Sequence, residues 1–264
     1  MSTSNSVPDF SSAPITAERL LPLLTTAASR IDLQTLEECD STNLQLQAMA
    51  KAGAPAGTLL LTERQTAGRG RRGRSWFQGP GALAFSLLWR LPDDRPPSGL
   101  SLAVGLALAE ALSAPSTPAV QLKWPNDVLV DGRKVAGILI ESAGAQKFVI
   151  GIGINFGSME GLPDELASIA TGIPVADRTR ALAQILDRLV TVLDEFAAHG
   201  FVPFQSRWQS RNAYQDLAVN LHFSEGGEPV QGVCRGVDAN GELLLETATC
   251  LQTIASGEVS LRLQ

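Results

Sequence analysis

The chain has 264 residues, and its 27 acidic and 21 basic side chains give a formal net charge of −6. This balance argues against a dedicated nucleic-acid-binding protein, which usually carries a basic face or a basic excess. Hydrophobic residues make up 44% of the chain, which suffices for one large domain or for one with a small companion. Residues 1–14 are polar rather than signal-like, and the apolar run at 100–112 is too short to cross a bilayer. We therefore expect a cytoplasmic protein that makes no membrane contact.

Apolar periodicity and turn residues predict the secondary structure from the N-terminus onward. Helices are expected, in spite of Pro22 in the first of them, at residues 15–30, 43–52, 100–113, 177–199 and 203–211. Strands are expected at residues 31–38, 58–62, 83–90, 120–124, 128–130, 134–142 and 147–154. Ser41 or Thr42 can cap the helix that Gly53 ends, and Asp131-Gly132 is a two-residue hairpin turn.

The sequence pattern of the chain changes after residue 217. Short strands recur there, separated by turns at Gly226-Gly227, Asn240-Gly241 and Ser256-Gly257, a pattern typical of a small closed β-barrel. We predict an α+β fold in which helices cover a mixed, largely antiparallel sheet and a small barrel follows. The expected divisions are an extension at residues 1–30, partly mobile and with one short helix, a lobe at 31–215 and the barrel at 216–264.

Residues 68–76 form the most informative stretch, Gly-Arg-Gly-Arg-Arg-Gly-Arg-Ser-Trp. Its glycines allow the backbone to adopt positive φ angles and to come close to a ligand. Its arginines are permanent cations whose planar heads suit phosphate and carboxylate groups. The sequence therefore predicts a loop that closes over a small polyanion.

This stretch is compatible with two other interpretations. The spacing of Gly68, Gly70 and Gly73 matches a dinucleotide-binding fingerprint, which is meaningful only between a strand and a helix. The loop signal Gly79-Pro80-Gly81 follows instead of a helix, so we reject that fold. A solvated basic run or nucleic-acid patch is less favoured, because it would not normally interleave glycines between two apolar strands.

A second motif reads Lys123-Trp124-Pro125-Asn126-Asp127 and is followed by Lys134 at the start of the return strand. The turn and the hairpin after it should bring both ammonium groups and the Asn-Asp pair to one end of a sheet. Asp127 could hold a hydrated Mg²⁺, which takes one or two carboxylates together with phosphate oxygens. The alternative is an ordinary turn with solvated lysines, and that alternative loses ground beside the arginine-rich loop.

Two further motifs offer neutral polar groups. The hydroxyls and amide of Asp40-Ser41-Thr42-Asn43 can bind a polar head group, although the same residues suit a helix N-terminus. Gly151-Ile152-Gly153-Ile154-Asn155 allows a flat ring to approach the strand end closely, and Asn155 can both donate and accept.

The cysteines and histidines exclude several kinds of chemistry. Cys39, Cys234 and Cys250 show no metal or redox spacing, and His199 and His222 lie far apart from each other and from any nucleophile motif. We predict no tightly bound metal and no His-based triad. Many cations without a nucleophile fit a reaction that joins two anions, such as a carboxylate and the α-phosphate of ATP, through fixed positive charge and positioning.

Five ordered motifs, at residues 40–43, 67–76, 123–127, 134–138 and 151–155, resemble those of biotin protein ligases, and residues 235–238 and 257–260 resemble their terminal barrel. The resemblance implies a class II synthetase-like lobe with a Src-homology-3-like barrel. It also implies a two-step reaction. Biotin and MgATP give biotinyl-5'-adenylate, which then acylates one lysine on the biotin carboxyl carrier protein of acetyl-CoA carboxylase. A homodimer is compatible with the resemblance.

The resemblance also assigns roles to residues. Lys134 and Arg71 are implied as catalytic, and Asp127 as a Mg²⁺ ligand through phosphate. Biotin-binding roles fall on Ser41, Thr42, Asn43, Gln65, Arg69, Gly70, Arg71, Lys134 and Gly137. Nucleotide-binding roles fall on Arg71, Arg72, Trp76, Lys123, Asn126 and Asn155.

Some family members carry an N-terminal helix-turn-helix and repress transcription. Only about 30 residues precede the lobe here, so we expect the form without that domain and no DNA binding. Two alternatives stay open. One is a lipoate or octanoate ligase of the same superfamily, and the other is a non-enzymatic, ligand-sensing nucleic-acid binder.

Overall fold

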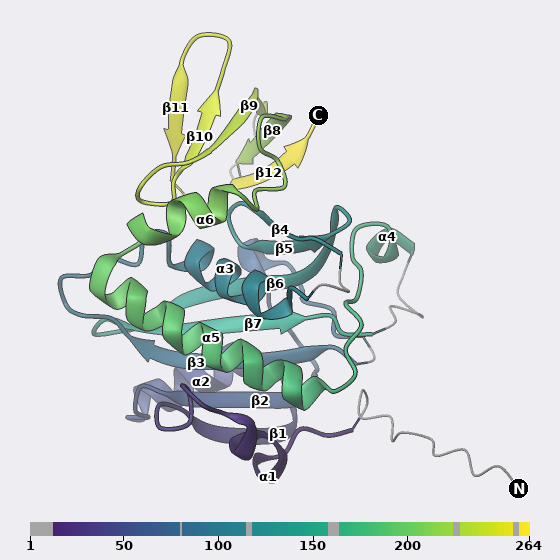
Figure 1. Cartoon of the computed structure of the whole chain (residues 1–264), viewed down its shortest axis with the longest axis vertical. Helices are drawn as coiled ribbons and strands as arrows, with labels where there is room; N and C mark the ends of the chain where they lie inside the picture. The colour runs from purple at the N-terminus through teal and green to yellow at the C-terminus, as the bar shows by residue number, and fades with distance from the viewer. Residues whose placement is uncertain (1–12, 80, 115–117, 158–163, 224–227, 256–258) are drawn as a thin grey trace, which may run out of the picture.

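The structure is a computed structural model that describes residues 13–79, 81–114, 118–157, 164–223, 228–255 and 259–264. Its larger sheet has seven strands in the order β1-β2-β3-β7-β6-β5-β4 (Figure 1). Only β1 and β2 pair in parallel, and every other neighbouring pair is antiparallel, which confirms the predicted sheet. The strands are β1 (Asp32–Cys39), β2 (Thr58–Gln65), β3 (Leu83–Arg90), β4 (Val120–Lys123), β5 (Asp127–Val130), β6 (Arg133–Gly144) and β7 (Lys147–Ile154).

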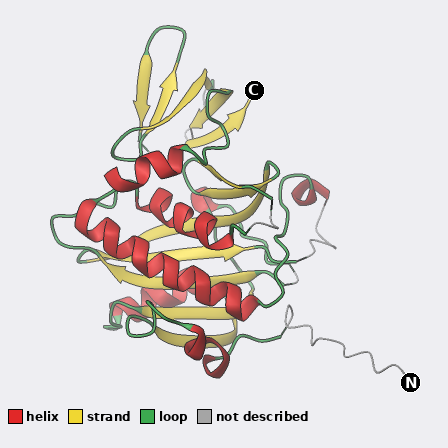
Figure 2. Cartoon of the chain, viewed as in Figure 1, coloured by secondary structure: helices red, strands yellow, loops and turns green. Residues whose placement is uncertain are grey.

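Helices cover both faces of this sheet. On one face, α3 (Leu100–Leu112) and α5 (Arg178–His199) pack side by side (Figures 1 and 2), while α2 (Thr42–Lys51) lies on the other. The strand β2 shows why both faces are apolar: Leu59 and Leu61 enter the main core, and Leu60 between them packs in a second cluster beneath α2. A strand buried on both sides needs a continuous apolar run rather than alternation.

The predicted elements of the lobe are present within a few residues, and the Asp131-Gly132 turn has the positive φ angles, 49° and 73°, of a two-residue hairpin. The helix expected at residues 15–30 is wrong in extent. Only α1 (Ala17–Leu20) and a 3₁₀ turn (Leu21–Leu23) form. Pro22 cannot donate to a continuing helix, and the backbone amides of Thr25 and Ala27 donate to Asp187 of α5 at 3.0 and 2.8 Å instead. Residues 1–12 lie outside the described part.

The second sheet is the expected small barrel-like unit. Its strands run in the order β11-β10-β9-β8-β12, all antiparallel. They are β8 (Ala218–Phe223), β9 (Val230–Val237), β10 (Leu243–Glu246), β11 (Leu251–Ile254) and β12 (Val259–Leu263). Gly241 turns between β9 and β10 with φ +79°, as predicted, whereas the turns at Gly226-Gly227 and Ser256-Gly257 lie outside the described residues.

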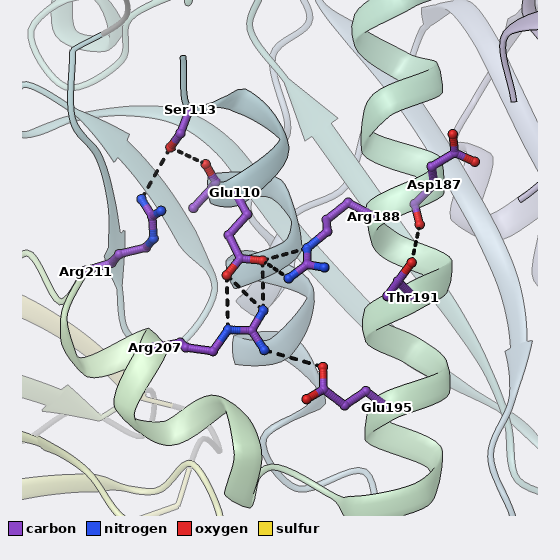
Figure 3. Close-up of polar contacts among 9 residues, drawn as sticks. Glu110, Ser113, Asp187, Arg188, Thr191, Glu195, Arg207 and Arg211 are labelled. Atoms are coloured by element: carbon purple, nitrogen blue, oxygen red, sulfur yellow. Dashed lines mark hydrogen bonds and ion pairs between the residues drawn. The ribbon is translucent and has the colours of Figure 1, made fainter. Parts of the chain in front are cut away.

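Polar contacts join the elements that frame the two sheets. Glu110 of α3 accepts hydrogen bonds from Arg188 of α5 at 2.6 Å and from Arg207 of α6 (Gln205–Gln209) at 2.9 Å (Figure 3). The indole nitrogen of Trp124 donates to the carbonyl of Gly241 at 3.2 Å, which ties the lobe to the second sheet. No helix within the described ranges is both long and apolar enough to cross a membrane.

Candidate active site

A cavity that is partly open to solvent lies between the start of α2, the arginine-rich loop and the facing ends of β6 and β7. All residues that the family resemblance assigned to the carboxylate substrate line it, together with two further residues assigned to the nucleotide alone. They are Ser41, Thr42, Asn43, Gln65, Arg69, Gly70, Arg71, Lys134 and Gly137, with Trp76 and Asn126. The fold thus brings together residues from all five sequence motifs, because Gly151 and Gly153 also line the cavity.

Neutral polar groups form one wall of the cavity. Gln65, at the end of β2, accepts hydrogen bonds through Oε1 from the backbone amide of Thr42 at 2.8 Å and from its hydroxyl at 3.2 Å. Gln65 therefore caps α2, and the expectation that Ser41 or Thr42 does so by its own side chain is wrong, since no side-chain cap bond forms there. The Ser41 hydroxyl and the Gln65 Nε2 amide have no hydrogen-bond partner among the described residues, so they are available to a ligand.

A buried polar chain supports this wall. Ser86 of β3 donates to Asn43 Oδ1 at 2.6 Å, and Asn43 donates to Glu141 Oε2 at 2.9 Å. Glu141 in turn pairs with Arg69 of the loop at 3.4 Å. Asn43 fits because Gly151 lies against it: a Cβ on that glycine would come within 2.0 Å of the amide oxygen. The Asn43 amide is thus engaged by the protein itself.

Ser86 and Glu141 were missed from the sequence. A lone serine inside the apolar strand Leu83–Arg90 was the available signal for Ser86, because a buried hydroxyl needs a partner. Glu141 gave no such signal, since a carboxylate on a partly exposed strand is ordinary.

Glycines also seat the end of the loop. Gly137 and Gly153 are register partners on β6 and β7, and the Trp76 ring lies against both. The strand end predicted to receive a flat ring therefore holds the protein's own indole in this structure. The Trp76 Nε1 donor is buried and has no partner among the described residues.

Cations also belong to the site. The Lys134 ammonium lies 2.6 Å from Asp127 Oδ1 and 5.6 Å from the Trp76 ring centroid. Lys123 is the backbone register partner of Asp127 across β4 and β5, and it does not line the cavity. Burial lowers the pKa of the Lys123 ammonium, and the nearby Asp127 carboxylate acts in the opposite direction. The predicted convergence of the two lysines on one sheet end is therefore present.

Of the three remaining residues predicted around the nucleotide, Arg72, Asn126 and Asn155, only Asn126 lines this cavity. Arg72, in the left-handed region with φ 61°, lines a neighbouring hollow of about 1000 Å³ together with Arg71. Asn126 donates to the Ile138 carbonyl at 2.8 Å. Asn155 does not line the cavity, and its buried Oδ1 has no partner among the described residues. Within that same part of the chain, no group of three or more His, Cys, Asp or Glu side chains gathers as a metal site would require.

This arrangement can bind an anion next to a neutral polar group in one enclosure. Ser41 and Gln65 present uncharged donors and acceptors, whereas Lys134, Arg69 and Arg71 present positive charge. Such a site suits a substrate with a neutral head and a carboxylate tail, held where a phosphate can meet it.

Comparisons with known proteins agree with this chemistry. Residues 36–155 match the model of the "Biotin/lipoate A/B protein ligase family", and residues 218–262 match the "Biotin protein ligase C terminal domain". The chain is 36% identical over 236 residues to the "Bifunctional ligase/repressor BirA" of Escherichia coli, covering 84% of this chain and 72% of that protein. It is 35% identical over 241 residues to the "Biotin--[acetyl-CoA-carboxylase] ligase" of Paracoccus denitrificans, covering 85% and 98%.

A solved structure shows the same fold. The biotin protein ligase from Aquifex aeolicus in complex with biotin and ATP superposes with a TM-score of 0.78 at 34% identity, covering 88% of this chain and 99% of that one.

Proposed function

The chain belongs to the biotin protein ligase family, and we propose that the cavity beside α2 is where it joins biotin to ATP. The enzyme forms biotinyl-5'-adenylate from biotin and MgATP, and then transfers biotin to a lysine of a biotin carboxyl carrier protein. One observation carries the assignment of the site. The cavity is lined both by uncharged polar side chains, Ser41 and Gln65, and by cations, Lys134 and Arg71.

The uncharged wall suits the ring system of biotin. Its cyclic urea offers two N–H donors and a carbonyl acceptor, all neutral. The Ser41 hydroxyl and the Gln65 Nε2 amide complement these groups, and both lack other partners among the described residues. The Thr42 hydroxyl is held by Gln65 and Ser86, so its role is to keep that wall in place.

In the first step, a biotin carboxylate oxygen attacks the α-phosphorus of ATP and the bond to pyrophosphate breaks. The two reactants are anions, so repulsion opposes their approach. Lys134 lines the cavity, and we assign it the main role of offsetting the charge that builds up there. Arg71 supplies a second fixed cation from the loop.

The nucleotide is proposed to bind among five further residues: Arg72, Trp76, Lys123, Asn126 and Asn155. Asp127 already pairs with Lys134. A single carboxylate suits a Mg²⁺ ion that is brought in by the phosphate oxygens of ATP, rather than one that the protein binds by itself. Mg²⁺ bound in that way neutralises part of the triphosphate charge.

In the second step, the ε-amine of the carrier lysine attacks the acyl carbon of the mixed anhydride and AMP leaves. We propose the carrier protein of acetyl-CoA carboxylase as the acceptor, which is what the Paracoccus relative is named for. Neither DNA nor a membrane is proposed as a partner, because the net charge is −6 and two of the four loop arginines, Arg69 and Arg71, line the cavity.

Biotin-dependent exchange of pyrophosphate into ATP tests the proposal. We expect exchange with biotin and Mg²⁺ together, and none when either is omitted. Lipoate and octanoate serve as the competing substrates. Equal exchange with them, or none with biotin, would overturn the assignment of this cavity to biotin.

A further inference from the structure

Lys123 is a half-buried cation that lacks a carboxylate of its own. Asp127, its register partner, is engaged by the Lys134 ammonium at 2.6 Å, and no carboxylate of the described residues forms an ion pair with Lys123. Burial lowers its pKa, the nearby Asp127 carboxylate acts in the opposite direction, and the positive charges of Lys134, Arg262 and Arg74 lower it further. A partly buried ammonium that shares its nearest carboxylate with a second lysine is costly unless something else stabilises it.

Tyr214 supplies that stabilisation. The Lys123 Nζ atom lies 5.4 Å from the centroid of the Tyr214 ring, within the range of a cation–π interaction. The tyrosine hydroxyl makes no hydrogen bond to any described residue. Burial, followed by the nearby Asp127, raises the pKa of Tyr214, so the ring stays neutral near pH 7. The interaction with Lys123 therefore runs through the ring face.

The segment that carries Tyr214 is held rigidly against β4. The amide of Leu122 donates to the Arg211 carbonyl, and the amide of Ala213 donates to the Leu122 carbonyl, both at 2.8 Å. The buried Asn212 accepts from the Tyr214 amide at 3.1 Å. This stretch joins α6 to β8, so the link between the two sheets sets the position of the ring.

We propose that Tyr214 is a positioning residue that keeps the Lys123 ammonium aimed at the phosphates of ATP. An aromatic face stabilises a cation without neutralising it, so the full positive charge remains for the incoming polyanion. A carboxylate in the same place would compete with phosphate. The inference rests on the proposed function of the neighbouring cavity, and it predicts an effect on ATP rather than on biotin, because Lys123 does not line the biotin wall.

Steady-state kinetics of biotin-dependent pyrophosphate exchange distinguish the effect of the Tyr214 ring from the effect of its hydroxyl. Tyr214→Phe should keep the parent KM for ATP, while Tyr214→Met should raise it roughly 3- to 30-fold, the range that corresponds to one cation–π interaction. The KM for biotin should stay at the parent value in both variants. Tyr214→Leu is a second ring-free variant for use if the Met variant does not fold, as judged by circular dichroism.

A double-mutant cycle shows whether Tyr214 acts through Lys123. In a Lys123→Met background, the additional Tyr214→Met change should raise the KM for ATP no further. Three results would overturn the inference: an unchanged KM in the ring-free variant, a Phe variant as impaired as the Met variant, or a full further loss in the Lys123→Met background. Absence of exchange in the parent enzyme would instead count against the proposed function.

Discussion

The indole ring of Trp76 lies against the backbone of Gly153, and a Cβ placed on that glycine would come within 2.3 Å of the ring. Real Cβ contacts are essentially never shorter than 3.0 Å, so an alanine at this position must displace the ring. The partner glycine, Gly137, is less tight toward the indole, at 3.3 Å. The two strands therefore form a seat for the end of the arginine-rich loop.

Gly153→Ala should consequently impair the enzyme without unfolding it. Forced overpacking costs roughly 1 to 3 kcal/mol, and we expect a roughly 5- to 100-fold fall in kcat/KM for ATP as Trp76 leaves its seat. Gly105→Ala is the matched control, since its new Cβ would make only ordinary contacts at 3.5 Å. Exchange kinetics of both variants provide the measurement. An equal kcat/KM for ATP in the two variants would contradict the inference that Gly153 positions the Trp76 ring.

Lys134→Ala should slow adenylate formation far more than it weakens ATP binding. The ammonium is assigned to charge that develops in the transition state, and losing one preorganised group of this kind costs ~3 kcal/mol, about two orders of magnitude in rate. Single-turnover adenylation measures the rate, and equilibrium titration measures ATP affinity. The exposed neighbour Arg133 provides the control variant Arg133→Ala. Near-normal single-turnover adenylation in Lys134→Ala would remove Lys134 from this role.

The sequence predicts best where local chemistry decides the structure. Asp131-Gly132 requires two residues with positive φ, and the structure has both. The helix at residues 15–30 fails for the opposite reason, because its outcome depends on Asp187, a residue more than 150 positions away that takes up two backbone amides. A long-range partner of this kind leaves no trace in the local pattern.

The residues of the candidate site also fall into those that local sequence could predict and those that it could not. Residues in motifs with several chemically rich neighbours, such as Lys134 beside the hairpin, could be predicted from the sequence. Glu141 and Tyr214 could not be predicted, because their contacts depend on strand register and packing. Glu141 accepts a hydrogen bond from Asn43, and the Tyr214 ring contacts Lys123 at the end of β4.

Glu110 lies between α3, α5 and α6, and changing it tests whether its ion pairs stabilise the packing of these helices (Figure 3). Its carboxylate, only 20% exposed, binds Arg188 and Arg207 together. Glu110→Gln leaves two guanidinium groups without their shared anion, and we expect a loss of roughly 1 to 3 kcal/mol in the free energy of unfolding. Asp93→Asn is the control, because Asp93 is 81% exposed in its pair with Arg90 and should change stability by no more than about 0.5 kcal/mol. Denaturant unfolding of both variants compares them, and an equally small change would argue against a structural role for Glu110.

The arginine-rich loop is folded upon itself in this structure. The amide of Gly70 donates to the Arg74 carbonyl at 2.7 Å, and the amide of Trp76 donates to the Gly68 carbonyl at 2.8 Å. Three glycines nevertheless make this conformation costly in backbone entropy, and the four arginines repel one another, although Glu141 offsets the charge of Arg69. A bound adenylate removes the repulsion, so ligand should strengthen the loop and shield the mixed anhydride from water.

Arg71→Gly should therefore release adenylate faster without blocking its synthesis, because the change removes a cation and adds backbone freedom. Arg71→Ala separates the two effects: a similar off-rate in both variants assigns the effect to charge, and a slower one in Arg71→Ala assigns part of it to flexibility. Arg180→Ala, at an exposed position on α5, is the control. Hydrogen exchange of residues 68–76 with and without biotin and ATP gives the second measurement. Equal protection in both states, together with an unchanged off-rate in the Arg71 variants, would show that the loop does not act as a lid.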